Sequence, residues 1–381
     1  MAATKRVAVV MLPVRTYCRH VLRGVVSVSL QARWECILIP AVPAPPLAHF
    51  AEGYIHGLIG HFSEKELVDQ VVQAGLPAVD VSPARPQLDF PRVTTDEIAV
   101  GRLAAAHLLS LGLPQFGFYG TRAEYSSFLR EKGFKETIQA AGLSCHVFVQ
   151  EDPTGNGETG LTDRPLEQWV CGLPKPIGVM ASSDGRALNL LAVCKKRGIA
   201  VPKSVAVVGV DNDDVFCELA SPPLSSIALS TQRIGYDAAR MLDRLMAGKR
   251  PTEKQLLVPP AGVVPRQSSD LPSLLDADVA AAVRYISLHV HDHLQVADVL
   301  REVPVSRRSL DQRFLKVLGR TPAAEIRRAQ VEVAKQMLAQ TDEPMTRVAR
   351  AAGFSNAKQL GATFHRETRA TPSAYRKEFR G

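Results

Sequence analysis

The sequence has no motif of the common catalytic sites: no P-loop, no HExxH pair and no nucleophile elbow. Its six cysteines show no CxxC spacing and lie mostly in apolar runs, which favours reduced packing residues of a cytosolic protein over disulfides or a zinc site. No apolar run approaches the ~20 residues needed to span a bilayer. The opening run Val7–Leu12 is too short for a signal peptide, so we expect a soluble, cytoplasmic protein without a membrane partner.

Excess positive charge is confined to one end of the chain. Residues 281–381 contain 18 Lys/Arg and 10 Asp/Glu, a net charge of +8, which is the formal net charge of all 381 residues. The remaining residues carry 28 of each kind and are neutral as a group. A phosphate-binding surface needs such segregation, so the C-terminal part is predicted to bind nucleic acid.

The basic end contains one pattern twice, at Val296–Ile326 and Met345–Tyr375. Leu310 and Phe314 of the first copy correspond to Leu360 and Phe364 of the second. Each copy predicts a short helix, a tight turn and a second amphipathic helix with that apolar pair on its buried face. This is the layout of a helix-turn-helix, whose second helix enters the DNA major groove. Two ordinary helical hairpins are the alternative, which the duplication disfavours.

The turns and caps of the two copies can be placed from residue type. Gly353 is expected to end a helix, because glycine takes the left-handed turn cheaply. Ser306 and Ser355 are expected as N-caps of the recognition helices. Long helix Pro322–Ala339 is expected to join the two units. The side chains expected to read bases or bind phosphates are Arg307, Arg308, Gln312, Arg313, Lys316, Asn356, Lys358 and Gln359.

Strand-like and helical stretches alternate from the start of the chain to about residue 260, which predicts parallel sheets covered by helices. Eight strands over this length suit two Rossmann-like lobes better than one sheet. The expected strands are Val7–Leu12, Cys36–Ile39, Gly57–Gly60, Ala78–Val81, Phe116–Tyr119, Val147–Val149, Ile177–Ala181 and Val205–Val210, with a further one at Ser226–Ser230. The fold class is therefore α/β, followed by an all-α domain.

The domain boundaries follow from composition. Residues 1–260 form the α/β domain, and the Pro-rich stretch Val258–Ser273 marks the linker, which we place at 261–276. The helical domain then occupies 277–381.

Polar residues fall where such a fold binds ligands, at the carboxyl ends of strands. They are Asp96, Arg130, Asp184, Asp211, Tyr17 and Arg19, of which the first four rank highest. Carboxylates accept hydroxyl hydrogens, guanidinium groups donate, and an aromatic ring covers a C–H face, so this set suits a neutral sugar. Five of the six also have a structural interpretation: N-caps for Asp96 and Asp184, solvated helix residues for Arg19 and Arg130, and a core residue for Tyr17.

Two sequence patterns resemble ligand-binding motifs but are not expected to bind a cofactor or a metal. Gly155–Gly160 matches GxGxxG, but acidic residues surround it and the strand-to-glycine distance is wrong, which indicates an exposed loop. His289, His291 and His293 fall short of a closed metal site and are expected as solvated residues at a helix end. No cofactor and no metal are expected.

The duplicated region resembles the paired helix-turn-helix domain of AraC/XylS-type activators. Gly319–Pro322 and Thr371–Arg376 match that family's closing signature, whereas Pro304 and Ala362 depart from its pattern. The α/β part resembles LacI/GalR regulators and periplasmic sugar-binding proteins. The matching residues are Thr95–Asp96, Ala99–Leu109, Arg130–Phe134, Ala181–Asp184 and Val207–Asn212, while Leu229 stands where relatives often have glutamine.

These resemblances imply a sugar-responsive transcription regulator, expected to be a D-xylose-dependent activator of pentose catabolic genes, whose two lobes form a periplasmic-binding-protein-like domain. The implied partners are double-stranded operator DNA, a monosaccharide effector (D-xylose or a related sugar), RNA polymerase and a second copy of the chain. Two alternatives stay open. One is a sugar-processing α/β enzyme with an accessory nucleic-acid-binding tail, and the other is a DNA-binding protein whose first domain only mediates assembly.

Overall fold

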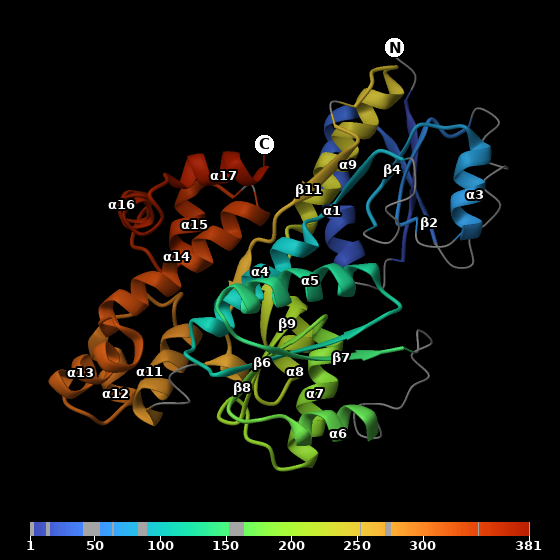
Figure 1. The fold of residues 1–381 in the computed structure, drawn as a ribbon. Helices are drawn as coiled ribbons and strands as arrows, with labels where there is room; N and C mark the ends of the chain where they lie inside the picture. The colour runs from blue at the N-terminus through green and yellow to red at the C-terminus, as the bar shows by residue number, and fades with distance from the viewer. Residues whose placement is uncertain are drawn as a thin grey trace.

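The computed structural model contains an α/β part made of two lobes and a helical C-terminal domain packed beside it (Figure 1). It describes residues 4–12, 16–40, 54–62, 65–82, 90–151, 164–251, 253–270, 276–341 and 343–380. None of the helices in these ranges has both the length and the apolar character needed to span a bilayer.

The first lobe is built on a six-stranded sheet in the order β11-β5-β4-β3-β1-β2, all of whose neighbours pair in parallel. Helices α1, α3 and α9 belong to this lobe, and α1 packs closely on α9. The elements are β1 (Arg6–Val10), α1 (Thr16–Ala32), β2 (Glu35–Ile39), β3 (Gly57–Gly60), α3 (Lys65–Ala74), β4 (Ala78–Asp80), β5 (Arg92–Thr95), α9 (Thr231–Met246) and β11 (Gln255–Val258).

The second lobe is built on another six-stranded sheet, in the order β12-β10-β9-β8-β6-β7, of which only β12 runs antiparallel to its neighbour. The strands are β6 (Gln115–Thr121), β7 (Cys145–Gln150), β8 (Ile177–Ala181), β9 (Val205–Asp211), β10 (Ser225–Ala228) and β12 (Gly262–Val264). The helices are α4 (Glu97–Leu109), α5 (Tyr125–Ala140), α6 (Arg164–Gly172), α7 (Asp184–Lys196), α8 (Asp214–Leu219) and the short 3₁₀ helix η1 (Gln267–Ser269).

Three crossings of the described chain connect the lobes: between β5 and α4, between β10 and α9, and between β11 and β12. They are joined by hydrogen bonds of 2.8 Å. The amide of Asp96 donates to the carbonyl of Val258, and the amide of Ala261 donates to that of Ala228. The hydroxyl of Ser230 donates to the carbonyl of Pro259. These segments form a hinge, and Asp96 belongs to it.

The Pro-rich stretch differs from the expected linker. Gly262–Val264 is strand β12, and the buried Ser268 receives a hydrogen bond from the amide of Ser225 and donates one to the carbonyl of Val207. The chain therefore stays in the second lobe as far as η1. Composition misled here because prolines suit an edge strand that follows a hinge crossing as well as they suit a linker.

The C-terminal domain contains two helix-turn-helix units, as the duplication predicts. Leu310 and Phe314 pack against Val299 in one core, and Leu360 and Phe364 pack against Val348 in the other. Helix α14 connects the two units. The helices are α11 (Ala277–Leu288), α12 (Val296–Glu302), α13 (Arg307–Leu318), α14 (Pro322–Gln340), α15 (Met345–Ala351), α16 (Ala357–Thr368) and α17 (Pro372–Arg380).

Cap positions agree with the sequence in one copy only. Ser306 is the N-cap of α13 and accepts a hydrogen bond from the amide of Ser309. In the second copy the N-cap is Asn356, so the expectation for Ser355 is wrong by one residue. The second copy has one more residue between its serine and its leucine than the first, Ser355 to Leu360 against Ser306 to Leu310, and this residue shifts the cap. Gly353 has a φ of 75° and ends the turn after α15, as predicted.

The six cysteines are free, but the packing interpretation holds only in part. Cys18, Cys194 and Cys217 are buried, whereas Cys36 and Cys171 are exposed. Cys36 lies on the edge strand β2 and Cys171 lies near the end of helix α6, where apolar neighbours in the sequence do not guarantee burial.

Candidate functional site

Arg130 lies on α5 with its guanidinium fixed at the hinge. Helices α4 and α5 approach closely because Gly101 and Gly133 lack side chains: a Cβ on Gly101 would lie 2.1 Å from the carbonyl oxygen of Arg130. This contact brings the Arg130 Nε within 2.6 Å of the Glu97 carboxylate. Nη1 donates to the carbonyl of Ser182, at the end of β8. Arg130 is therefore a buried, oriented donor rather than the solvated residue of the structural interpretation.

Asp211 ends β9 in a backbone conformation that non-glycine residues rarely adopt, with φ of 109°. Burial raises the pKa of Asp211 to about 8, and the nearby Arg130 only partly offsets this effect. A strained, partly buried carboxyl at a strand end next to a guanidinium is typical of a functional site.

Asp184 supports the second lobe from within. It is buried, and its two carboxylate oxygens accept hydrogen bonds from the Ser226 hydroxyl at 2.6 Å and from the Asp213 amide at 2.8 Å. Burial raises the pKa of Asp184 to about 6. The N-cap of α7 is Ser183, so the N-cap alternative for Asp184 is wrong. For Asp96 it is right: Oδ1 accepts from the amide of Ala99.

Tyr17 lies where the lobes meet, because it packs against the apolar clusters of both. Its hydroxyl donates to the carbonyl of Val81 at 2.8 Å, and its ring stands edge-on to His61. Burial, and then the charge of Glu97, raise the pKa of Tyr17. Arg19 is different, since it is exposed and donates to the Thr16 hydroxyl.

Sequence reasoning missed two hydroxyl groups at strand ends. Thr95 Oγ1 and Ser182 Oγ are buried and have no hydrogen-bond partner in the part of the chain that the structure describes. A buried hydroxyl without a partner is costly, so a ligand hydroxyl would be favourable at these positions. Their sequence signals are a place within two residues of Asp96 and Asp184 and inside the stretches that match the LacI/GalR pattern, but small hydroxyl residues are too common to stand out.

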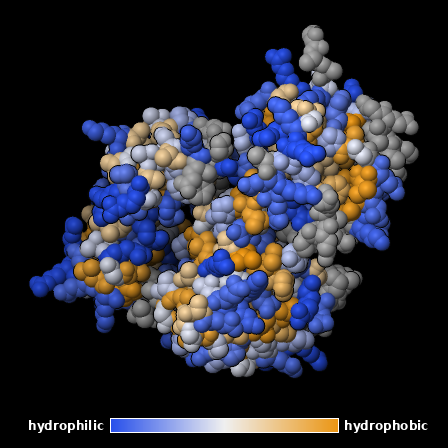
Figure 2. All heavy atoms as spheres, turned by 45° about the horizontal axis from the view of Figure 1, so that its top comes forward, coloured by the Kyte–Doolittle hydropathy of each residue, from blue (hydrophilic) through white to orange (hydrophobic). Residues whose placement is uncertain are grey.

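The expected DNA-contacting residues of the first unit divide into two groups. Arg307, Arg308, Gln312 and Lys316 are exposed on α13, and hydrophilic side chains cover much of the helical domain (Figure 2). Arg313 instead points toward α11, where it forms ion pairs with Asp276 and Asp278. Arg308, Gln312 and Lys316 recur at every fourth residue and therefore share one helix face.

In the second unit the expected residues are all exposed, but two of them are engaged locally. Asn356 caps α16 by accepting from the amide of Gln359 at 2.9 Å. The Gln359 side chain in turn accepts from the amide and the hydroxyl of Ser355. Lys358 lies on the same exposed turn. The N-terminal end of α16 is thus ordered before any contact with DNA.

The histidines are not simply solvated. His291 contacts the carbonyl oxygen of Ala351, and His293 Nδ1 lies 3.0 Å from the carbonyl oxygen of Gly353. Both histidines therefore connect the loop after α11 to the turn that follows α15. Among the described residues no His, Cys, Asp and Glu cluster could hold a metal. Gly155–Gly160 lies outside the described residues.

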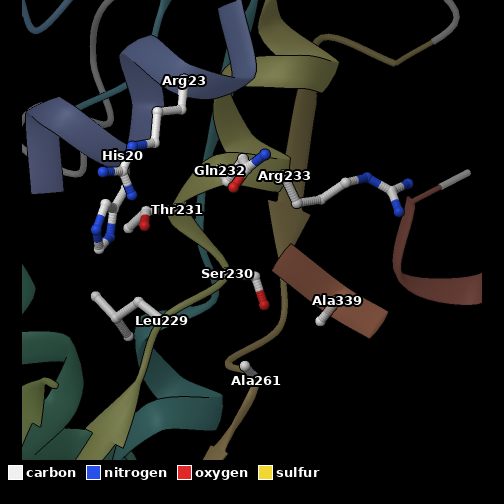
Figure 3. Close-up of a pocket in the computed structure, with 9 residues that line it drawn as sticks. All are labelled: His20, Arg23, Leu229, Ser230, Thr231, Gln232, Arg233, Ala261 and Ala339. Atoms are coloured by element: carbon white, nitrogen blue, oxygen red, sulfur yellow. The ribbon is translucent and has the colours of Figure 1, made fainter. Parts of the chain in front are cut away.

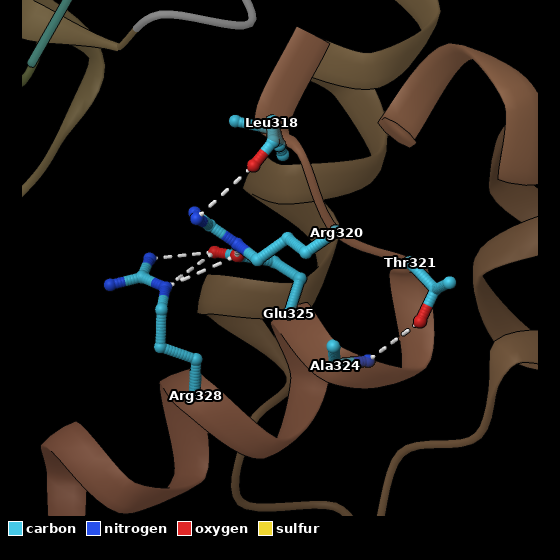
Figure 4. Close-up of polar contacts among 6 residues, drawn as sticks. All are labelled: Leu318, Arg320, Thr321, Ala324, Glu325 and Arg328. Atoms are coloured by element: carbon cyan, nitrogen blue, oxygen red, sulfur yellow. Dashed lines mark hydrogen bonds and ion pairs between the residues drawn. The ribbon is translucent and has the colours of Figure 1, made fainter. Parts of the chain in front are cut away.

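Arg328 of helix α14 lies close enough to the second lobe to affect the pKa of His107 there. Glu325 is buried and accepts hydrogen bonds from Arg328 and Arg320 (Figure 4). Burial opposes ionisation of Glu325, yet these bonds outweigh it and lower its pKa. Within the second lobe, His107 of α4 lies 2.7 Å from the Ser269 hydroxyl of η1. Burial, with Arg328 as a second cause, lowers the pKa of His107 to about 4, so this histidine is neutral.

The other end of α14 meets the hinge. Ala339 lines a pocket together with Ser230 and Ala261 of the crossings and with His20 and Arg23 of α1 (Figure 3). Arg328 of α14 is thus electrostatically close to His107 of the second lobe, and Ala339 of the same helix lines the pocket at the hinge.

Comparisons with known proteins agree with this architecture. Residues 105–269 match a periplasmic binding protein-like domain, and residues 299–378 match a helix-turn-helix domain. The xylose operon regulatory protein of Haemophilus influenzae is 31% identical over 84% of this chain and 85% of its own length. That of Escherichia coli K12 is 28% identical over 95% of this chain and 94% of its own. The solved structure of a xylose-binding transcription activator has a TM-score of 0.62 and 26% identity, and the match covers 99% of each chain.

A two-lobed binding domain joined to paired helix-turn-helix units defines a ligand-responsive, DNA-binding transcription regulator. The fold class and the resemblance predicted from the sequence are confirmed. The chain belongs to the family of xylose operon regulatory proteins. It is a sugar-responsive regulator of transcription.

Proposed function

We propose that the effector is a pentose, D-xylose or a close relative, bound between the lobes by Asp96, Arg130 and Asp211. The oriented guanidinium of Arg130 carries this proposal, because its Nε and Nη1 are held by Glu97 and Ser182 while other donors remain for a ligand. The names of the relatives point to xylose. Tyr17 covers the bound sugar where the lobes meet, and Asp184 holds the strand ends of the second lobe in place. Arg19 contacts the sugar from the exposed edge of the site.

The test is calorimetry of the full chain with D-xylose, L-arabinose, D-ribose and D-glucose. We expect D-xylose to bind most tightly. Asp211→Asn should abolish the response to sugar while operator binding persists. Loss of both functions together would instead assign Asp211 a role in folding.

The DNA-binding part of the proposal concerns α13 and α16. Their exposed residues enter two successive major grooves on one face of operator DNA, with Arg307, Arg308, Gln312 and Lys316 from the first unit. Asn356, Lys358 and Gln359 act from the second unit, and Arg313 acts after release from its ion pairs. The exposure of most of these side chains and the local excess of positive charge support this assignment.

We infer that the chain works by binding rather than by catalysis, since its relatives are regulators. It acts in the cytoplasm as a homodimer on paired half-sites and recruits RNA polymerase. The sensing domain ends near residue 270, and the DNA-binding domain begins with α11. Sugar binding favours the closed lobes, and α14 senses closure because Arg328 lies near His107 of the second lobe and Ala339 lines the pocket at the hinge.

A further inference from the structure

Glu97 is the partner of Arg130 and was not among the residues expected from the sequence. It is the first residue of α4, next to Asp96, and only 3% of its surface is exposed. Arg130 is 5% exposed, and the two side chains form an ion pair of 2.6 Å. Both charged groups are therefore removed from water, where their charges act more strongly on each other and on a ligand.

The geometry gives Glu97 two effects on Arg130. It holds the Nε edge, while Ser182 holds Nη1, so the plane of the guanidinium is fixed. It also cancels the positive charge: burial by itself would lower the pKa of Arg130, but Glu97 and the other nearby carboxylates outweigh it and raise that pKa. Two of the five guanidinium N–H donors are used by these bonds, and the others can still donate to a ligand.

The charge around this pair is not positive. Asp211 lies near enough to Arg130 for each to shift the pKa of the other, but burial keeps Asp211 protonated at neutral pH, and Asp184 contributes negative charge. A neutral sugar requires only donors and acceptors from such a cleft. A sugar carrying a carboxylate or phosphate would need an uncompensated cation, because transfer of an unpaired anion from water is costly.

We propose that Glu97 is a positioning and specificity-determining residue, which fixes Arg130 and neutralises it so that the cleft accepts uncharged sugars and rejects acidic ones. The inference rests on the proposed binding of a sugar in this cleft. It deepens that proposal by naming the class of sugar and the residue that selects it.

The experiment compares Glu97→Gln with the unaltered full chain. Calorimetry is performed with two pairs of neutral and acidic ligands, D-xylose with D-xylonate and D-glucose with D-glucuronate. In Glu97→Gln the amide can still accept from Arg130, but the compensating charge is lost. We expect D-xylose to bind roughly tenfold more weakly, and the neutral-to-acidic affinity ratio to fall by at least about tenfold.

Two variants separate charge from position. Glu97→Asp keeps the charge on a shorter side chain, so it should bind D-xylose more weakly with the neutral-to-acidic ratio retained. Glu124→Gln removes a carboxylate that is exposed, and it should change the ratio by no more than about twofold, since exposed charges are screened. Operator binding by each variant checks its folding.

The outcomes distinguish this inference from the proposed function. If the unaltered chain binds none of the neutral sugars, the proposed sugar site fails. If it binds D-xylose and Glu97→Gln keeps the original ratio, only the role of Glu97 is overturned. Loss of the ratio in Glu97→Asp would overturn it as well, because that variant retains the charge.

Discussion

Thr16 and Asp213 are hydrogen-bonded across the two lobes. The Thr16 hydroxyl, at the start of α1 in the first lobe, donates to the Asp213 carboxylate, at the N-cap of α8 in the second. Arg19 donates to the same hydroxyl at 2.8 Å. The amide of Asp213 in turn donates to Asp184, so this contact connects α1 of the first lobe to a buried carboxylate of the second.

Thr16→Val keeps the shape of the side chain and removes the hydroxyl. A hydrogen bond to a charged group contributes about 1.5–3 kcal/mol when sheltered, and partial exposure reduces this to about 1 kcal/mol. We expect calorimetry to show roughly fivefold weaker D-xylose binding. Ser27→Ala is the matched control, because the Ser27 hydroxyl bonds only locally to the carbonyl of Gly24 on the same helix. Equal affinities for the two variants would contradict a closing role for Thr16.

Asp211 should make stability depend on pH. Its pKa is about 8 in the folded chain against an ordinary value of 3.8. Below about pH 4 the carboxyl is protonated in both states, and its contribution to stability is fully present. As pH rises toward 8 the unfolded chain releases this proton while the folded chain retains it, so the free energy of unfolding decreases.

The melting temperature should therefore fall between about pH 5 and 8. Asp211→Asn should flatten this dependence, with each 1 kcal/mol corresponding to about 2–4 °C. Asp184 acts with the same sign at lower pH, since its pKa is about 6. Parallel curves for the two proteins would show that Asp211 is ionised in the folded state.

Gly353→Ala should be far more damaging than Gly319→Ala. Both glycines have positive φ, 75° and 65°, so alanine is strained at either position by about 1–2 kcal/mol. A Cβ on Gly353 would also lie 1.9 Å from the carbonyl oxygen of Val290, whereas nothing lies within 4 Å of one on Gly319. We expect faster amide exchange over α15 and α16 and loss of operator binding only in Gly353→Ala. Similar exchange in both variants would refute the steric argument.

Arg308→Ala and Arg313→Ala should act differently on DNA binding. Arg308 is exposed, and loss of a base contact costs about 1–3 kcal/mol, or roughly tenfold in affinity. Arg313 is paired with Asp276 and Asp278, so its loss should lower the melting temperature and weaken DNA binding less. Fluorescence anisotropy with operator and scrambled DNA at two salt concentrations measures the affinity and the sequence preference of each variant. Lost sequence preference with unchanged stability in Arg313→Ala would instead make Arg313 a base reader.

Ala339→Leu should disturb communication between the domains. The added side chain fills the pocket where α14 meets Ser230 and Ala261. We expect the ratio of operator affinities with and without D-xylose to fall severalfold, within the 1–3 kcal/mol typical of coupling between sites. Glu332→Gln, on the same helix and paired with Lys335, serves as the control. An unchanged ratio in Ala339→Leu would exclude this contact from signalling.

The sequence predicted the helices and strands whose hydrophobic residues recur at regular spacing. Long amphipathic helices such as α14 and buried strands such as β8 lie where predicted, and both helix-turn-helix units were found from their repeat. Strands β5, β11 and β12 were not predicted. They are three to four residues long, and their pairing with residues far along the chain leaves no local pattern.

For the candidate site, the sequence predicted which polar residues lie at the strand ends but not which of them contact one another. Arg130 and Asp211 were expected there, and the structure places them close together. Glu97 and Ser182 could not be found, because their roles depend on the contact between α4 and α5 and on the position of β8. Arg313 is a case in which the sequence predicted a contact that the fold makes less favourable. Its charge predicted contact with DNA, but the fold pairs it with Asp276 and Asp278, which lie more than 30 residues away in the sequence.

Strand β12 determines which lobe carries the helical domain. Because the chain returns to the second lobe through β12 and η1 before α11 begins, the DNA-binding units are anchored there. When the helix-turn-helix units are bound to the operator, the second lobe would thus stay fixed relative to the DNA. Opening and closing would then consist of a rotation of the first lobe about the hinge.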